Sequence, residues 1–199
     1  NSTPRYAGLF YSDTWTATAR NNENVVATDG TVTRFDVGVS AYPGADGNGY
    51  DFIIYKNGVA QDGSGGTPNT TVRILGDLVV GYSTFSLAVS AGDYLEVGTA
   101  EIGTALARQV GFSANFIADA DGEYLLCGGT TDSLSVSETQ QTYPVSIYGD
   151  LWITDPAGKT VLGGVSSIAL GKFRVLASAA PGAGGSGDTY TLTLRRNTT

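Results

Sequence analysis

The sequence contains no histidine and no methionine, and its only cysteine is Cys127. Without histidine it lacks the most common general base and the most common ligand of transition metals, and a Ser-His-Asp triad cannot form. A single cysteine allows no disulfide within the chain, and in the apolar stretch EYLLCGG it is expected to be a small buried residue. A chain without methionine that begins at Asn1 is expected to be a processed product or a fragment.

Basic residues are also scarce. Lysine and arginine number 11 against 19 aspartates and glutamates, which gives a formal net charge of −8 at pH 7. Such a surface repels phosphate backbones, so nucleic-acid binding is not expected. No apolar run is long enough to span a bilayer and no signal-peptide pattern is present, so membrane association is not expected either.

No pattern of catalytic residues is present. Asp93, Glu96 and Glu101 are the carboxylates that folding could pair for glycoside hydrolysis, but nothing in the sequence selects a pair among them. The glycine-rich segments at 63–66 and 182–187 are not followed by the Lys-Ser/Thr and helix of a phosphate-binding loop. The sequence therefore predicts no catalytic residue, no cofactor and no enzymatic activity.

What the chain has in abundance is glycine, 28 residues, together with many threonines, serines, valines and tyrosines. This composition favours strands joined by tight turns, and few segments could sustain a helical period. Several segments alternate apolar and polar residues, as strands with one buried face do. The inward residues are predicted to be Phe35, Val37 and Val39; Tyr50, Phe52 and Ile54; Phe85, Leu87 and Val89; Leu95 and Val97; and Val110, Phe112, Ala114 and Phe116.

Turn chemistry separates these segments, and Asn57-Gly58 is a favourable pair for a two-residue hairpin turn. A single open sheet would leave the aromatic residues of one face in water, whereas two packed sheets bury them. The predicted fold is therefore all-β, an antiparallel β-sandwich of the jelly-roll kind.

Part of this pattern occurs twice. Phe35 and Phe173 are 138 residues apart, and Tyr50 and Tyr190 are 140 apart, with a Pro-Gly turn between the two aromatic residues in both copies. The repeat predicts a complete sandwich unit at 1–118, a linker at 119–122 and a partial second unit at 123–199. The alternative is chance similarity between glycine- and valine-rich strands.

The segments FDVGVSAYPGADGNGYDFIIYKNGVA, STFSLAVSAGDYLEVGTA and FRVLASAAPGAGGSGDTYTLTLRRN carry a further indication. Their order of strand, Pro-Gly hairpin and Ala-Gly-Asp turn resembles that of bacteriophage virion proteins with tandem β-sandwich domains, such as tail-fibre and minor structural proteins. The resemblance implies a β-sandwich fold and a place in the virion. It rests on turns and strands and implies no site residues.

A half sandwich exposes its core face, so something must cover the second unit. We expect neighbouring subunits to do so, in a homo-oligomer for which a trimer is the prediction, alongside other virion proteins. The expected interface residues are Phe173, Val175, Tyr190, Leu192 and Leu194. A tail fibre and a capsid decoration protein are equally compatible with this reading.

Two other kinds of function stay open. A module that recognises host surface glycans would use exposed aromatic residues, of which Tyr42 and Trp152 are candidates, and Trp15 is a further one. The alternative for each is a place in the core or an interface. An extracellular bacterial filament or adhesin subunit would use the same sharing of strands.

The acidic stretch DADGE offers Asp119, Asp121 and Glu123 as weak candidates for calcium ligands. The twelve-residue spacing of a calcium-binding loop is absent, so a solvated acidic linker is the alternative.

Overall fold

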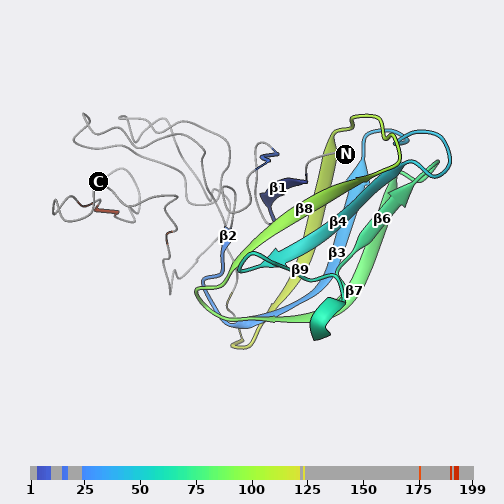
Figure 1. The fold of residues 1–199 in the computed structure, drawn as a ribbon. Helices are drawn as coiled ribbons and strands as arrows, with labels where there is room; N and C mark the ends of the chain where they lie inside the picture. The colour runs from blue at the N-terminus through green and yellow to red at the C-terminus, as the bar shows by residue number, and fades with distance from the viewer. Residues whose placement is uncertain are drawn as a thin grey trace, which may run out of the picture.

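The structure is a computed structural model that describes residues 4–9, 15–17, 24–121, 123, 175, 189 and 191–192. In these residues the chain forms nine strands, one short 3-10 helix and no α-helix (Figure 1). The elements are β1 (Arg5–Gly8), β2 (Asn24–Val25), β3 (Gly30–Val39), β4 (Gly49–Lys56), β5 (Val59–Ala60), η1 (Ser64–Gly66), β6 (Val72–Leu75), β7 (Val80–Val89), β8 (Tyr94–Ile102) and β9 (Val110–Ala118).

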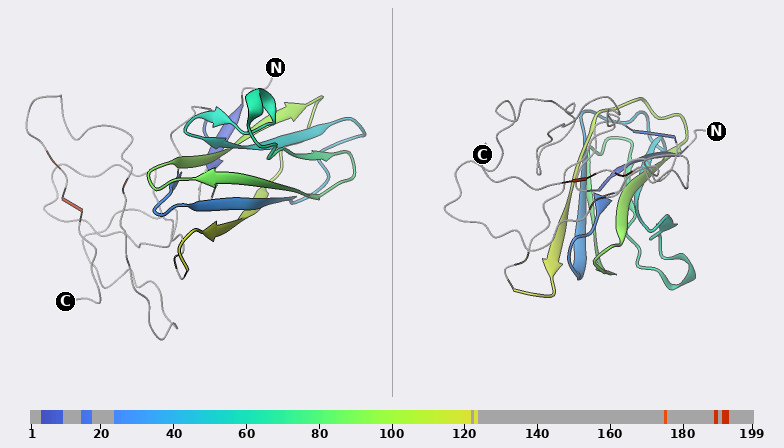
Figure 2. Two further views of the ribbon diagram at one scale, coloured as in Figure 1. Left: turned by 90° about the horizontal axis from the view of Figure 1, so that it is seen from below. Right: turned by 90° about the vertical axis from the view of Figure 1, so that its left-hand side faces the viewer.

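The strands form two antiparallel sheets (Figure 2). In the six-stranded sheet, β4 and β8 pair along their lengths; β5 and β6 pair with β4, and β1 and β2 pair with β8. In the three-stranded sheet, β3 lies between β7 and β9. The prediction of an all-β antiparallel sandwich is confirmed, while the jelly-roll order of its strands stays a prediction.

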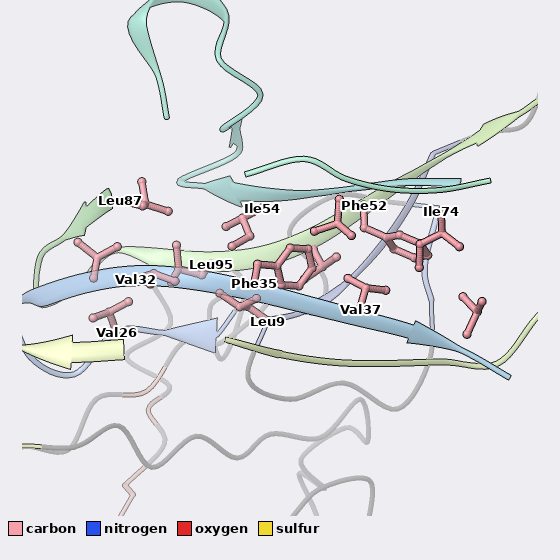
Figure 3. Close-up of a cluster of buried hydrophobic side chains, with 14 residues drawn as sticks. Leu9, Val26, Val32, Phe35, Val37, Phe52, Ile54, Ile74, Leu87 and Leu95 are labelled. Atoms are coloured by element: carbon pink, nitrogen blue, oxygen red, sulfur yellow. The ribbon is translucent and has the colours of Figure 1, made fainter. Parts of the chain in front are cut away.

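The core lies between the two sheets (Figure 3). Phe35 of β3 and Phe52 of β4 are almost completely buried and come from opposite sheets. The alternation of apolar residues predicts these faces correctly, because successive side chains of a strand point to opposite sides. The remaining predicted inward residues are either buried or packed against the core as partly buried side chains.

The hairpin turn after β4 also forms as predicted. Lys56 pairs with Val59, and Asn57 and Gly58 between them have φ angles of 52° and 78°. Positive φ at both central residues matches the twist of the flanking strands, and asparagine and glycine tolerate it best. The turn therefore fixes the register of β4 against β5.

β3 carries an irregularity between Val32 and Arg34, where its register shifts against both β7 and β9. Such a bulge bends the strand and re-aims the side chains around it. β9 ends at Ala118, and the predicted division into a unit at 1–118, a linker and a unit at 123–199 stays a prediction. No helix in the described part of the chain is long and apolar enough to cross a membrane.

Candidate functional site

The face of the three-stranded sheet that points away from the core carries an ordered set of side chains. We call it the outer face. Antiparallel register aligns three rows of residues across the three strands, and directly opposed residues share one face of a sheet. From β7 through β3 to β9 the rows are Val80, Gly38 and Gly111; Tyr82, Asp36 and Ser113; and Thr84, Arg34 and Asn115.

The glycine row leaves a hollow in this face. The hollow has a volume of about 660 Å³, and its lining includes Gly38 and Gly111, with Val80 and Tyr82 on the β7 side. Val80 and Tyr82, on the edge strand β7, are 69% and 63% exposed. Opposed glycines on adjacent strands thus create a depression next to an exposed aromatic ring.

Arg34 and Asp36 are two residues apart on β3 and therefore share the outer face. Nε of Arg34 donates to both carboxylate oxygens of Asp36 at 2.9 and 2.8 Å, and Nη2 donates to Oδ1 at 2.7 Å. The guanidinium carbon lies 4.3 Å from the centre of the Tyr82 ring. The aromatic ring and the ion pair therefore form one cluster.

The ion pair shifts the pKa values of both side chains. Hydrogen bonds from Arg34 lower the pKa of Asp36 below its ordinary value of 3.8, against the opposing effect of burial. Hydrogen bonds to Asp36 raise the pKa of Arg34 above its ordinary value. At neutral pH the pair carries one positive and one negative charge, so the cluster is neutral overall.

The free side of β9 is the second feature that could serve a function. β9 pairs with β3 on one side, and no other described strand pairs with it. It is nine residues long, VGFSANFIA, and contains no charged residue and no proline. Edge strands are usually protected by being short, by charged side chains, by proline or by a covering segment, because an open edge can add a strand.

The other edges among the described strands are protected. β1, β2, β5 and β6 are two to four residues long. β7 is long, but it approaches the other sheet: a Cβ added at Gly81 would lie 3.0 Å from Val72, and the Ser83 hydroxyl donates to the Asn69 carbonyl at 3.2 Å. β7 contains no charged residue either, so β9 differs from it because the other sheet approaches β7 and not because of its composition.

The weak calcium candidates have different surroundings. Asp119 and Asp121 are exposed, whereas the Glu123 carboxylate accepts a hydrogen bond from the Thr28 hydroxyl. Among the described residues, no three acidic, cysteine or histidine side chains gather as a group that could hold a metal ion.

The aromatic residues that the sequence offers for glycan contact differ in their surroundings. Tyr42 is 58% exposed in the loop after β3, and its carbonyl accepts a hydrogen bond from Arg108 at 2.8 Å. Trp15 packs against the core, with ring centres 6.3 Å from Phe52 and 6.1 Å from Phe112. Trp152 lies outside the described residues.

Of the expected interface residues, Val175 and Leu192 are described and are 49% and 40% exposed. Phe173, Tyr190 and Leu194 lie outside the described residues, so the predicted interface of the second unit stays a prediction.

The three candidate carboxylates of β8 and the turn before it have separate surroundings. Asp93 forms an ion pair with Lys56 at 3.0 Å. Glu96 is buried, at 1% exposure, and lies opposite Tyr55. Glu101 accepts a hydrogen bond from the Ala105 amide at 2.9 Å. The Asp93 and Glu101 carboxylates are thus each engaged by a contact within the sandwich.

No protein-family model, no curated protein and no solved structure matches the chain. The cluster of Tyr82, Arg34 and Asp36 was not singled out in the sequence. The only signal was the alternation in β3, which places Arg34 and Asp36 on the face opposite Phe35.

Proposed function

We propose that this chain is a non-enzymatic structural protein of a bacteriophage virion, a tail-fibre or capsid-decoration component. It assembles into a homo-oligomer by adding a strand of a neighbouring subunit to the free side of β9. The resemblance of its strand and turn pattern to virion proteins supports the virion setting. The uncharged edge of β9 carries the proposal of assembly.

The physical reason lies in the backbone of the edge. An unpaired strand of nine residues presents a row of amide and carbonyl groups, and a second strand satisfies them through main-chain hydrogen bonds. β9 also carries Ile117, which is 60% exposed on the outer face. A neighbouring strand beside β9 would cover part of this side chain and add apolar burial to the hydrogen bonds.

A lysine in this strand tests the proposal. Ile117→Lys places a charge in β9, where two copies would bring like charges together or desolvate an ammonium group. The matched control is Val59→Lys, since Val59 is 56% exposed on β5 of the other sheet. Both variants change the net charge of the chain by the same amount.

Sedimentation velocity over a range of concentrations is the measurement. We expect the unchanged chain and Val59→Lys to associate with equal affinity. Ile117→Lys should associate at least about tenfold more weakly. A chain that stays monomeric at every concentration contradicts the proposal, as does equal association of all three proteins. Copy number in purified particles then separates the two locations, since a capsid component is present in far more copies than a tail component.

A further inference from the structure

Packing within the described part of the chain does not require glycine at the two positions of the hollow. A Cβ added at Gly111 would meet no atom of the described residues within 4 Å, and one added at Gly38 would lie 3.8 Å from its nearest neighbours, an ordinary contact. Neither residue has a positive φ. Glycine within a strand weakens the strand. At these two positions it lowers the stability of β3 and β9 and leaves the space above them open.

Other strand glycines provide the contrast. A Cβ added at Gly30, Gly49 or Gly98 would come within 2.4, 2.0 or 2.4 Å of a neighbouring atom, so packing requires glycine there. The hollow above Gly38 and Gly111 is therefore a feature of the outer face that packing within the sandwich does not explain.

The groups around the hollow combine two kinds of surface. Tyr82 and Val80 offer an apolar wall, and Tyr82 is held on one side by the guanidinium of Arg34 at 4.3 Å from its ring centre. Asp36 and Ser113 bring hydrogen-bonding groups to the same hollow. Binding sites for small ligands commonly combine an aromatic wall with a few fixed polar groups.

We propose that this hollow binds a neutral pyranose ring of a glycan. One face of a pyranose presents C–H groups that pack on an aromatic ring, and its rim presents hydroxyls that donate to carboxylates and accept from guanidinium groups. The ring lies against Tyr82, and its hydroxyls bond to Asp36, Arg34 and Ser113.

The charge of the site selects neutral sugars. Arg34 is neutralised by Asp36 through three hydrogen bonds, so the hollow offers no unpaired cation to an acidic sugar. The chain as a whole carries a net charge of −8, which repels anionic ligands. Substitutions in the hollow should therefore weaken the binding of neutral sugars, while acidic sugars bind weakly to every variant.

The experiment is ligand-observed NMR titration with lactose, maltotriose, cellotriose, mannotriose and chitotriose, with sialyllactose as the acidic comparison. Two variants test the geometry. Gly111→Val fills the hollow at a position where an added Cβ meets no atom of the described residues within 4 Å. Tyr82→Ala removes the aromatic wall, and Tyr42→Ala is its control, because Tyr42 is exposed at 58% but does not line the hollow.

We expect at least one neutral oligosaccharide to bind more tightly than sialyllactose. Gly111→Val and Tyr82→Ala should each weaken that binding by about tenfold or more, and Tyr42→Ala should leave it unchanged. Absence of binding by every neutral sugar, unchanged binding by Gly111→Val and Tyr82→Ala, or preference for sialyllactose would overturn the proposal. Sedimentation of the same samples reports association through β9 separately, so failure of one proposal is distinguishable from failure of the other.

Discussion

The side-chain amide of Asn57 donates a hydrogen bond of 2.7 Å to the carboxylate of Asp93. It joins the turn after β4 to the turn that precedes β8. The same carboxylate pairs with Lys56 at 3.0 Å and accepts the Ser90 amide at 2.8 Å, and Oδ1 of Asn57 accepts the Tyr94 amide at 3.0 Å. The carboxylate thus links the end of β4 and its turn to the turn between β7 and β8, at one end of the sandwich.

Replacing this carboxylate should destabilise the fold. In Asp93→Asn the ion pair with Lys56 is lost, and one of the two oxygens that accept from Asn57 and Ser90 is replaced by an NH2 group. We expect a loss of about 1–3 kcal/mol in the free energy of unfolding. Asp77→Asn is the control, because Asp77 is exposed in the loop after β6, and it should stay within about 0.5 kcal/mol. Urea unfolding measures both, and an Asp93→Asn protein as stable as the control would refute the role of this cluster.

The same cluster gives a dependence on pH. Burial acts to raise the pKa of Asp93, but hydrogen bonds from the Ser90 amide, Asn57 and Lys56 together lower it below its ordinary value of 3.8. A pKa that is lower in the folded state stabilises the fold above the pKa of the unfolded state, and this contribution is lost as the pH falls through the folded value. The stability difference between the unchanged protein and Asp93→Asn should therefore be constant above about pH 5 and shrink below about pH 4. A difference that grows on acidification has the wrong sign.

Two strand glycines should respond to alanine in opposite directions. At Gly49 an added Cβ would lie 2.0 Å from the carbonyl oxygen of Ile74, so Gly49→Ala should destabilise the protein by about 1–3 kcal/mol or prevent folding. At Gly111 the added Cβ meets no atom of the described residues within 4 Å, so Gly111→Ala should stabilise the protein by about 0.5–1 kcal/mol. Thermal unfolding of the pair checks this, and a destabilised Gly111→Ala would show that packing needs this glycine.

The core should depend strongly on Phe35. Its side chain has no exposed area and its ring centre lies 6.2 Å from that of Phe112. Phe35→Ala leaves a cavity between the sheets and should cost about 3–5 kcal/mol. Thr84→Ala on the exposed side of β7 is the control and should change stability by less than about 0.5 kcal/mol. Equal effects in chemical denaturation would mean that Phe35 does not lie at the centre of the core.

The fold could be predicted because its main signals are local. Alternation places Phe35 and Val37 on one face of β3. The Asn57-Gly58 dipeptide predicts the hairpin turn, in which the two residues have φ angles of 52° and 78°. Both depend on residues adjacent in sequence, whose geometry follows from the pleat of a strand and from the twist of a hairpin.

The outer face could not be predicted in this way. Tyr82 lies opposite Asp36 only through the register of β3 with β7, and Ser113 joins them only through that of β3 with β9. The shift between Val32 and Arg34 changes both registers, and no local pattern in the sequence announces it. Tyr42, the described candidate for glycan contact that is exposed in the loop after β3, does not line the hollow.

The calcium candidates illustrate a different property of local sequence signals. Asp119, Asp121 and Glu123 are close in sequence, which made them candidates, yet closeness along the chain does not make their carboxylates converge. The Glu123 carboxylate instead accepts the Thr28 hydroxyl. Metal sites need convergent ligands. Among the described residues, no group of three such side chains is found.

Hydrogen exchange at the amides of β9 tests the assembly proposal most directly. The measurement compares exchange at low and high protein concentration, with β4 as the internal control, because β4 is paired on both sides within the sandwich. We predict that the amides on the free side of β9 become protected as concentration rises, while protection of β4 does not change. Protection of β9 that is the same at every concentration would contradict pairing of this strand with a neighbouring subunit.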